Sequence, residues 1–192
     1  MNDPNEVQQK NIQAGWVAGR DIHNHQYLTP AHAEFDGLVK SFHEDLKGDQ
    51  QPKAMLDDLM HLSTQRQNDK VIGLEAKLSA AGRDGDYIAR GEEMKERFSK
   101  RLYKHTFSES AQKIYLCLLN DVAMLFQLRV LPRILEGAPP AEVDALISKE
   151  IIAVVEARLG PHKFVLDLYA REIAGMLYFL TGNCHLNWIR AC

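Results

Sequence analysis

The sequence feature that most restricts the fold is a long apolar segment, residues 109–135, whose hydrophobic side chains recur at helical spacing. These side chains lie on most sides of the expected helix, and Ser108 is of a residue type that caps helix N-termini. A helix that is apolar on most sides is stable in water only when other elements cover it. We therefore predict that residues 109–135 form the central, most buried helix, and that Pro132 kinks or ends it.

The segments around this helix carry apolar side chains on one face only, which is typical of helices that pack around a common core. The expected helices cover residues 29–47, 55–62, 70–82, 84–102, 140–155 and 164–180. No alternating strand pattern follows residue 28. The sequence therefore predicts an all-α fold, a single multi-helix, bundle-like domain over residues 27–192. A short extended or β segment over residues 1–26 is expected to precede it.

Glycines in and after the last expected helix, residues 164–180, have different expected roles. Gly175 lies inside the helix, where a missing side chain permits close packing against another helix at some cost in helix propensity. Gly182 follows the helix and can adopt the left-handed conformation that closes it, which Asn183 also tolerates. Leu186 and Trp188 in the short tail can then fold back over the core.

Composition and charge favour a soluble protein of the cytoplasm. Of the 192 residues, 45% are hydrophobic and 26% are charged, which is ordinary for a globular domain. The net charge of -3 gives the whole molecule no strong attraction to nucleic acid or to an anionic membrane. Charged residues interrupt the apolar windows, so we expect buried helices rather than bilayer spans. Three cysteines are too few for a disulfide framework.

The stretch "NIQAGWVAGRDIHNH", residues 11–25, allows three interpretations: a phosphate-binding loop, a metal site, or an extended segment that needs a partner. Its two glycines are one residue too close together for a phosphate-binding P-loop, and Arg20-Asp21 follows them in place of Lys and Ser or Thr. His23 and His25 would share one face of a strand, but a structural zinc site needs more ligands and no cysteine lies nearby in sequence. Two solvated histidines are therefore the preferred interpretation of that pair.

The third interpretation, an extended segment that pairs with another chain, is favoured over a solvated tail. Written as a strand, the segment has a modest apolar side that includes Trp16, and a lone strand leaves its N–H and C=O groups unpaired. We expect it to pair with a second copy of the chain, forming a homo-oligomer, or with a partner protein. The expected interface residues are Ile12, Gly15, Trp16, Val17, Gly19, Arg20, Asp21 and Ile22.

One basic run, "MKERFSKRLYKH", is a candidate face for nucleic acid or for a partner protein. Arg97, Arg101 and Lys104 follow each other at helical spacing, and Lys100 lies between them. Three upstream acids, Glu92, Glu93 and Glu96, offset part of this charge. A solvated helix face is the commoner outcome for such a run.

Catalytic patterns are hard to find in the sequence, which contains neither G-x-S-x-G nor H-E-x-x-H. Cys184 and His185 are adjacent, whereas a nucleophile and its base usually meet across the fold. A small metal-dependent hydrolase that uses His23, His25, Cys184 and His185 is a third and weaker hypothesis. We expect a protein that is not an enzyme and that holds no metal and no cofactor.

Three stretches together resemble proteins of bacterial conflict systems. "AGWVAGRDIHNH" is similar to a short element near the N-terminus of many such proteins. "VIGLEAKLSAAGR", with "RFSKRLYKHTFSESAQKIYLCLL" after it, resembles the middle of the C-terminal domain of ABC-three-component systems. "EIAGMLYFLTGNCHLNW" resembles the end of that domain. The resemblance covers most of residues 11–190, and none of its motifs is catalytic.

The resemblance implies a role in defence against phages or other invading elements, in systems organised like the Lamassu systems. Such systems combine an ABC-type or SMC-like ATPase, a small middle component, and an effector joined to this kind of domain. Only about 28 residues precede the expected helical domain, so we expect no fused effector. The expected function is that of a non-enzymatic adaptor that docks the effector, the ATPase or both. The alternative is a nucleic-acid-binding sensor that uses Arg97, Lys100, Arg101 and Lys104.

Overall fold

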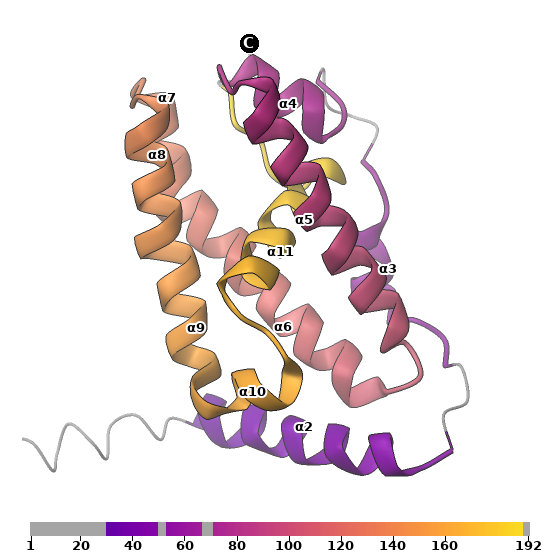
Figure 1. Ribbon diagram of the computed structural model, residues 1–192. Coiled ribbons are helices and arrows are strands. Elements are labelled where there is room, and N and C mark those ends of the chain that lie inside the picture. The colour runs from indigo at the N-terminus through magenta and orange to yellow at the C-terminus, as the bar shows by residue number, and fades with distance from the viewer. Residues whose placement is uncertain (1–29, 50–52, 67–70, 190–192) are drawn as a thin grey trace, which may run out of the picture.

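The computed structural model describes residues 30–49, 53–66 and 71–189, and every regular element in these ranges is a helix (Figure 1). The prediction of an all-α fold is confirmed for this part of the chain. The first elements are α2 (Pro30–Lys47), α3 (Asp57–Ser63), α4 (Leu74–Ala80) and α5 (Gly85–Lys104). The expected extended segment over residues 1–26 lies outside the described residues.

Two long helices follow, and each contains a π-helical segment near its middle or end. The first runs through α6 (Glu109–Leu125), η1 (Phe126–Val130) and α7 (Leu131–Leu135). The second runs through α8 (Pro140–Leu146), η2 (Ile147–Ile152) and α9 (Ala153–Leu159). The two helices form a hairpin with the turn at Gly137, where φ is +87°, and the two π-helical segments pack against each other.

Pro132 does not end the first long helix, which continues to Leu135. The backbone N–H of Leu131 donates to the carbonyl of Phe126, five residues earlier, so the helix widens by one residue immediately before the proline. Proline cannot donate a backbone hydrogen bond and its ring crowds the preceding turn, which is why a local change of helix type is needed there.

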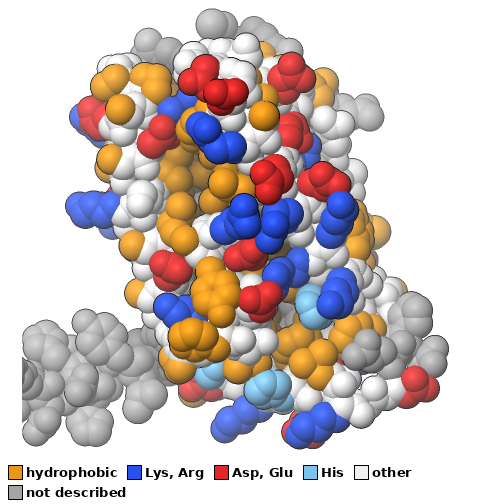
Figure 2. All heavy atoms as spheres, in the orientation of Figure 1, with side chains coloured by type: hydrophobic (Ala, Val, Ile, Leu, Met, Phe, Trp, Pro, Cys, Tyr) orange, Lys and Arg blue, Asp and Glu red, His pale blue; other side chains and the backbone are white. Residues whose placement is uncertain are grey.

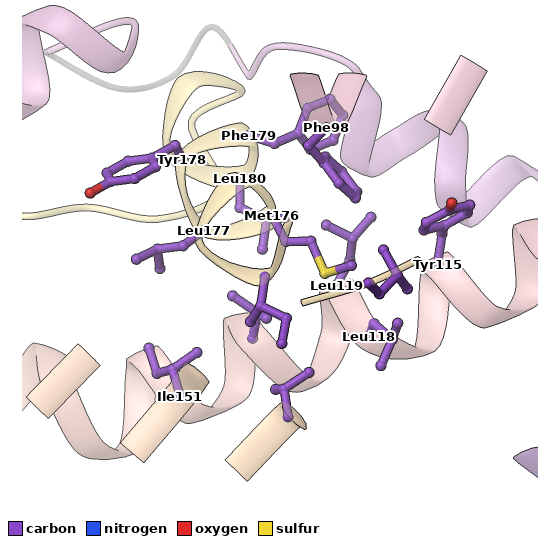
Figure 3. Packing of buried hydrophobic residues seen from close by; sticks show 14 of the residues in the cluster. Phe98, Tyr115, Leu118, Leu119, Ile151, Met176, Leu177, Tyr178, Phe179 and Leu180 are labelled. Atoms are coloured by element: carbon purple, nitrogen blue, oxygen red, sulfur yellow. The ribbon is translucent and has the colours of Figure 1, made fainter. Parts of the chain in front are cut away.

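The central position belongs to α11 (Ala170–Gly182), which contacts α3, α4, α5, α6, η2 and α9. Figure 3 shows its side chains directed toward Phe98 on α5, toward Leu118 and Leu119 on α6, and toward Ile151. The prediction that residues 109–135 form the most buried helix was therefore wrong. That helix buries one face and leaves Met124 and Leu128 exposed at 51% and 65%.

By length and composition alone, Glu109–Leu135 is also a helix that can cross a membrane, the one such helix in the described part of the chain. The core helix of a soluble protein meets the same criterion. Its buried side chains, among them Leu118, Val122 and Phe126, belong to the hydrophobic core that it shares with α2 and α11. The expectation that the chain does not span a bilayer stays a prediction.

Gly175 lets α11 approach α5 more closely than a side chain would allow. A Cβ at this position would lie 2.7 Å from the carbonyl oxygen of Met94 and 2.9 Å from Cβ of Phe98, both on α5. Gly91 on α5 makes a similar but looser contact, because a Cβ there would lie 3.4 Å from Leu78 and Tyr178. The predicted role of Gly175 in helix packing is confirmed.

The expected helix over residues 164–180 is broken in two. η3 (Gly160–His162) leads into α10 (Lys163–Leu166), after which Asp167 adopts the left-handed conformation with φ of 52°. α11 then starts at Ala170, where the carboxylate of Glu172 accepts a hydrogen bond of 3.2 Å from the backbone N–H of Tyr169. No glycine or proline marks this break, so helical periodicity alone did not reveal it.

The tail after α11 folds back over the core as predicted, and Leu186 and Trp188 are exposed at only 2% and 1%. Lys77 is fully buried and donates a 2.8 Å hydrogen bond to the carbonyl of Leu186, which fixes the tail to α4. The prediction for Gly182 was wrong, because it remains in the helix beside the side chain of Lys95. The left-handed conformation falls instead on Cys184, with φ of 64°.

Replacing Gly175 with alanine should destabilise the protein by about 1–3 kcal/mol, because the new Cβ meets backbone atoms of α5 that cannot move independently. The matched control is Gly37→Ala on α2, where a Cβ meets no atom within 4 Å. The control should be neutral or stabilising by about 0.5–1 kcal/mol through helix propensity. Urea denaturation followed by circular dichroism measures both, and equal effects would contradict the packing argument.

Candidate functional site

A groove of about 450 Å³ opens where α2, α5 and the α10–α11 segment meet. Four basic side chains of α5 line it: Arg97, Lys100, Arg101 and Lys104. Four apolar side chains of α2 and α10 line it as well: Phe42, Leu46, Val165 and Leu166. His105, Asp167 and Glu172 complete the lining. We call these eleven residues the basic groove.

The basic face predicted from the sequence is therefore part of a real concave surface. The structure brings Arg97, Lys100, Arg101 and Lys104 together along one side of the groove. Figure 2 shows Lys and Arg side chains gathered over the lower half of α5, with Asp and Glu side chains among them. Apolar side chains of α2 and α10 lie beside these cations in the groove.

Arg101 and Lys100 are already engaged within the chain. The Arg101 guanidinium donates from Nη1 to the carbonyl of Asp167 at 2.7 Å and to that of Leu166 at 3.1 Å, and from Nη2 to the Asp167 carboxylate at 2.7 Å. It thereby holds the bend between α10 and α11. The Lys100 ammonium pairs with Glu96 one turn earlier at 2.6 Å, and both side chains are exposed.

Arg97 and Lys104 differ from these two cations. Both side chains are exposed, and within residues 30–49, 53–66 and 71–189 neither has an ion-pair or hydrogen-bond partner. Seven residues separate them, so they lie about 10 Å apart along one side of α5. At these two positions in the groove, an external anion meets a cation that has no partner among the described residues.

The apolar floor of the groove was not predicted from the sequence. Phe42 and Leu46 belong to the apolar stripe of α2, which the sequence indicates as core. Phe42 is indeed buried, but Leu46 is 39% exposed at the groove. Val165 and Leu166 reach the groove because α10 ends at Asp167, a break that has no local sequence signal.

His105 lies at the C-terminal end of α5, between the cations and the floor. Its ring packs edge-on against Phe42 with 5.3 Å between ring centroids. Burial, with smaller effects of Lys104 and Arg101, lowers the pKa of His105. Its Nδ1 atom is buried and has no hydrogen-bond partner among the described residues, so a proton there gains no acceptor. Burial and the missing acceptor thus both favour the neutral form of His105 in this wall of the groove.

Hydrogen bonds between α2 and the start of α6 fix the wall of the groove that α2 supplies. The hydroxyls of Ser108 and Ser110 each donate to the carboxylate of Asp45 at 2.6 Å. These bonds, that from Ser108 first, lower the pKa of Asp45. Ser108 Oγ also accepts from the backbone N–H of Ala111 at 3.0 Å, so the predicted N-cap of the long helix is confirmed.

The other candidate constellations do not form a site within the described residues. Cys184 is buried at 4% exposure, while the ring of His185 reaches the carbonyl of Thr64 at 3.3 Å and packs against His61. No group of three or more His, Cys, Asp or Glu side chains is placed to hold a metal ion in the described ranges. His23, His25 and the expected interface residues between Ile12 and Ile22 lie outside those ranges.

The described part of the chain is thus an all-α domain with an open, charged groove on its surface. The chain belongs to C-terminal domain 9 of the ABC-three component (ABC-3C) systems, because the model of that family matches residues 73–188. The match runs from the start of α4 to Trp188 and does not include α2. It confirms the resemblance of the helical part, and it does not reach the N-terminal element. Neither a curated protein nor a solved structure gives a significant match to the chain.

Folding stability should decrease at mildly acidic pH partly because of His105. Its pKa is lower in the folded chain than the usual 6.5, so the unfolded chain binds the proton first as the pH falls. The contribution is fully present above about pH 6.5 and is lost as the pH falls through the folded pKa. His105→Gln should reduce the loss of stability between about pH 7 and pH 5, measured by urea denaturation at each pH.

The control for this experiment is His43→Gln on α2, whose ring is exposed rather than buried. The pH dependence of the control should follow that of the wild type. His185, whose pKa is also lowered by burial, accounts for a remaining part of the dependence in both variants. An unchanged pH profile in His105→Gln would contradict the assignment.

Proposed function

We propose that the chain is a non-enzymatic adaptor of an ABC-three component system that docks the effector, the ATPase or both. The observation that carries this proposal is the family match over residues 73–188, which gives the chain a place in such a system and suggests partners within it. The basic groove supports it, because a concave surface with cations that have no partner among the described residues, beside the exposed Leu46, is suited to binding a partner. An antiphage role in the cytoplasm is part of the same proposal.

The absence of enzymatic activity is part of this proposal. In the groove, Arg101 is engaged in holding the α10–α11 bend, and Glu172 is engaged at the start of α11. Neighbouring His105 is half-buried and packed against Phe42 rather than paired with a nucleophile. These contacts give Arg101, Glu172 and His105 structural roles, which supports binding over chemistry.

Self-association through residues 11–25 also belongs to the proposal, and its motivation remains the apolar side and the glycines of that stretch. A second surface adds to it. Met124, Leu128 and Leu135 on the first long helix are exposed at 51%, 65% and 42%. Exposed large apolar side chains that gather on a surface are typical of a protein contact.

The alternative function, a nucleic-acid-binding sensor, is supported by the gathering of Arg97, Lys100, Arg101 and Lys104 in one groove. Two of these cations are already paired with Asp167 and Glu96. Fewer free cations mean fewer phosphate contacts and a weaker electrostatic contribution to binding. The adaptor is therefore the preferred function.

The adaptor proposal predicts that the full-length chain co-purifies with the ATPase or the effector encoded in its own ABC-three component system. A tagged chain is co-expressed with both proteins, and the bound fraction is measured by size-exclusion chromatography with light scattering. A variant that lacks residues 1–26 should show a smaller mass or lose a partner if that segment supplies pairing. A wild-type chain that binds neither protein would refute the adaptor role, and identical masses and identical partner binding by both forms would refute the pairing role.

A further inference from the structure

Resting on the proposed function, we propose that the partner segment bound by the basic groove is acidic and amphipathic. Carboxylates of that segment meet Arg97 and Lys104, and apolar side chains between them pack on Leu46 and Val165. The partner segment comes from another subunit of the same system.

The charges of the groove require a ligand with separated negative charges. Among the groove's cations, Arg97 and Lys104 are the two without a partner in the described part of the chain, and they lie about two helical turns apart on α5. A helix that runs alongside α5 and carries acidic residues two turns apart places one carboxylate at each cation. This correspondence in spacing is the charge complementarity that the partner must have.

The floor of the groove requires apolar side chains from the ligand. Leu46 is 39% exposed, and the half-buried Val165 faces the same groove. Covering them stabilises the complex at roughly 25 cal/mol per Å² of apolar surface removed from water. A segment with an apolar residue between two acidic residues covers this surface, so the groove fits an amphipathic helix better than a uniformly charged one.

The carboxylates around the groove disfavour nucleic acid. Asp167 and Glu172 line it, and Glu96 is one turn from Lys100. A nucleic-acid strand carries a negative phosphate at every nucleotide and so brings some of them against these carboxylates. A peptide places neutral or apolar residues there. Phe42 is buried at 3% exposure, so its ring offers no exposed face for base stacking.

The test uses the full-length chain and two fluorescent helical peptides. One carries glutamate and leucine at helical spacing, and the other carries glutamine in place of each glutamate. Single-stranded and duplex DNA serve as further probes. Fluorescence anisotropy at two salt concentrations should show that the chain binds the glutamate peptide. The affinity for the glutamine peptide and for both DNAs should be weaker by about tenfold or more.

Two variants, each with a matched control, assign the binding to the groove. Arg97→Glu combined with Lys104→Glu should weaken binding of the glutamate peptide by at least about tenfold, because it replaces two attractions with repulsions. Lys40→Glu combined with Lys149→Glu changes the net charge equally at exposed positions outside the groove and should leave binding unchanged. Leu46→Ser should weaken peptide binding several-fold, and the exposed Met60→Ser on α3 is its control.

Equal loss of binding in both charge-reversed variants, or no binding of the glutamate peptide, would overturn the inference. DNA that binds more tightly than the glutamate peptide, with an affinity that Leu46→Ser does not change, would also overturn it. Co-purification with the system's own ATPase and effector distinguishes a failure of the groove assignment from a failure of the adaptor role. If the variant with Arg97→Glu and Lys104→Glu still binds the same partner as the wild type, the groove assignment fails while the adaptor role stands.

Discussion

The close contact between α5 and α11 is the constraint on which the rest of the structure depends. Gly175 makes it possible, because the carbonyl of Met94 and the Cβ of Phe98 occupy the space that a side chain would need. With α11 held there, its remaining sides are free to contact α6, α4 and the second long helix. The same contact fixes the orientation of α5: Phe98 and Leu102 point into the core, so Arg97, Lys100, Arg101 and Lys104 must face outward.

Helix identity was predictable from the sequence because it depends on local patterns. Apolar spacing and caps gave the positions of most helices, including the cap at Ser108. The bend at Asp167 and the conformation of Gly182 were predicted wrongly, because contacts distant in sequence decide both. Arg101 reaches Asp167 across 66 residues, and Lys95 occupies the space beside Gly182.

The cations of the candidate site were predictable from local sequence, whereas its apolar floor was not. Four cations at helical spacing indicate one face of a helix, and in the structure Arg97, Lys100, Arg101 and Lys104 line one groove. The floor opposite them comes from α2 and α10, which are distant in sequence and look like core when read alone. Part of that floor, Phe42 and Leu46, also lies outside the residues that the family model matches. The groove is thus built from the matched domain together with a preceding helix.

Arg101 has two roles in one side chain, and this connects the shape of the groove to its occupancy. Its guanidinium holds the carbonyls of Leu166 and Asp167 while it also faces the groove. A ligand carboxylate that competed with Asp167 for this guanidinium would loosen the end of α10, and a rigid α10 would in turn weaken that ligand. By thermodynamic reciprocity, anion affinity at Arg101 and the order of residues 163–169 oppose each other, so that one falls as the other rises. Substituting Arg101 would therefore alter architecture and recognition at once, whereas Arg97 and Lys104 report on recognition alone.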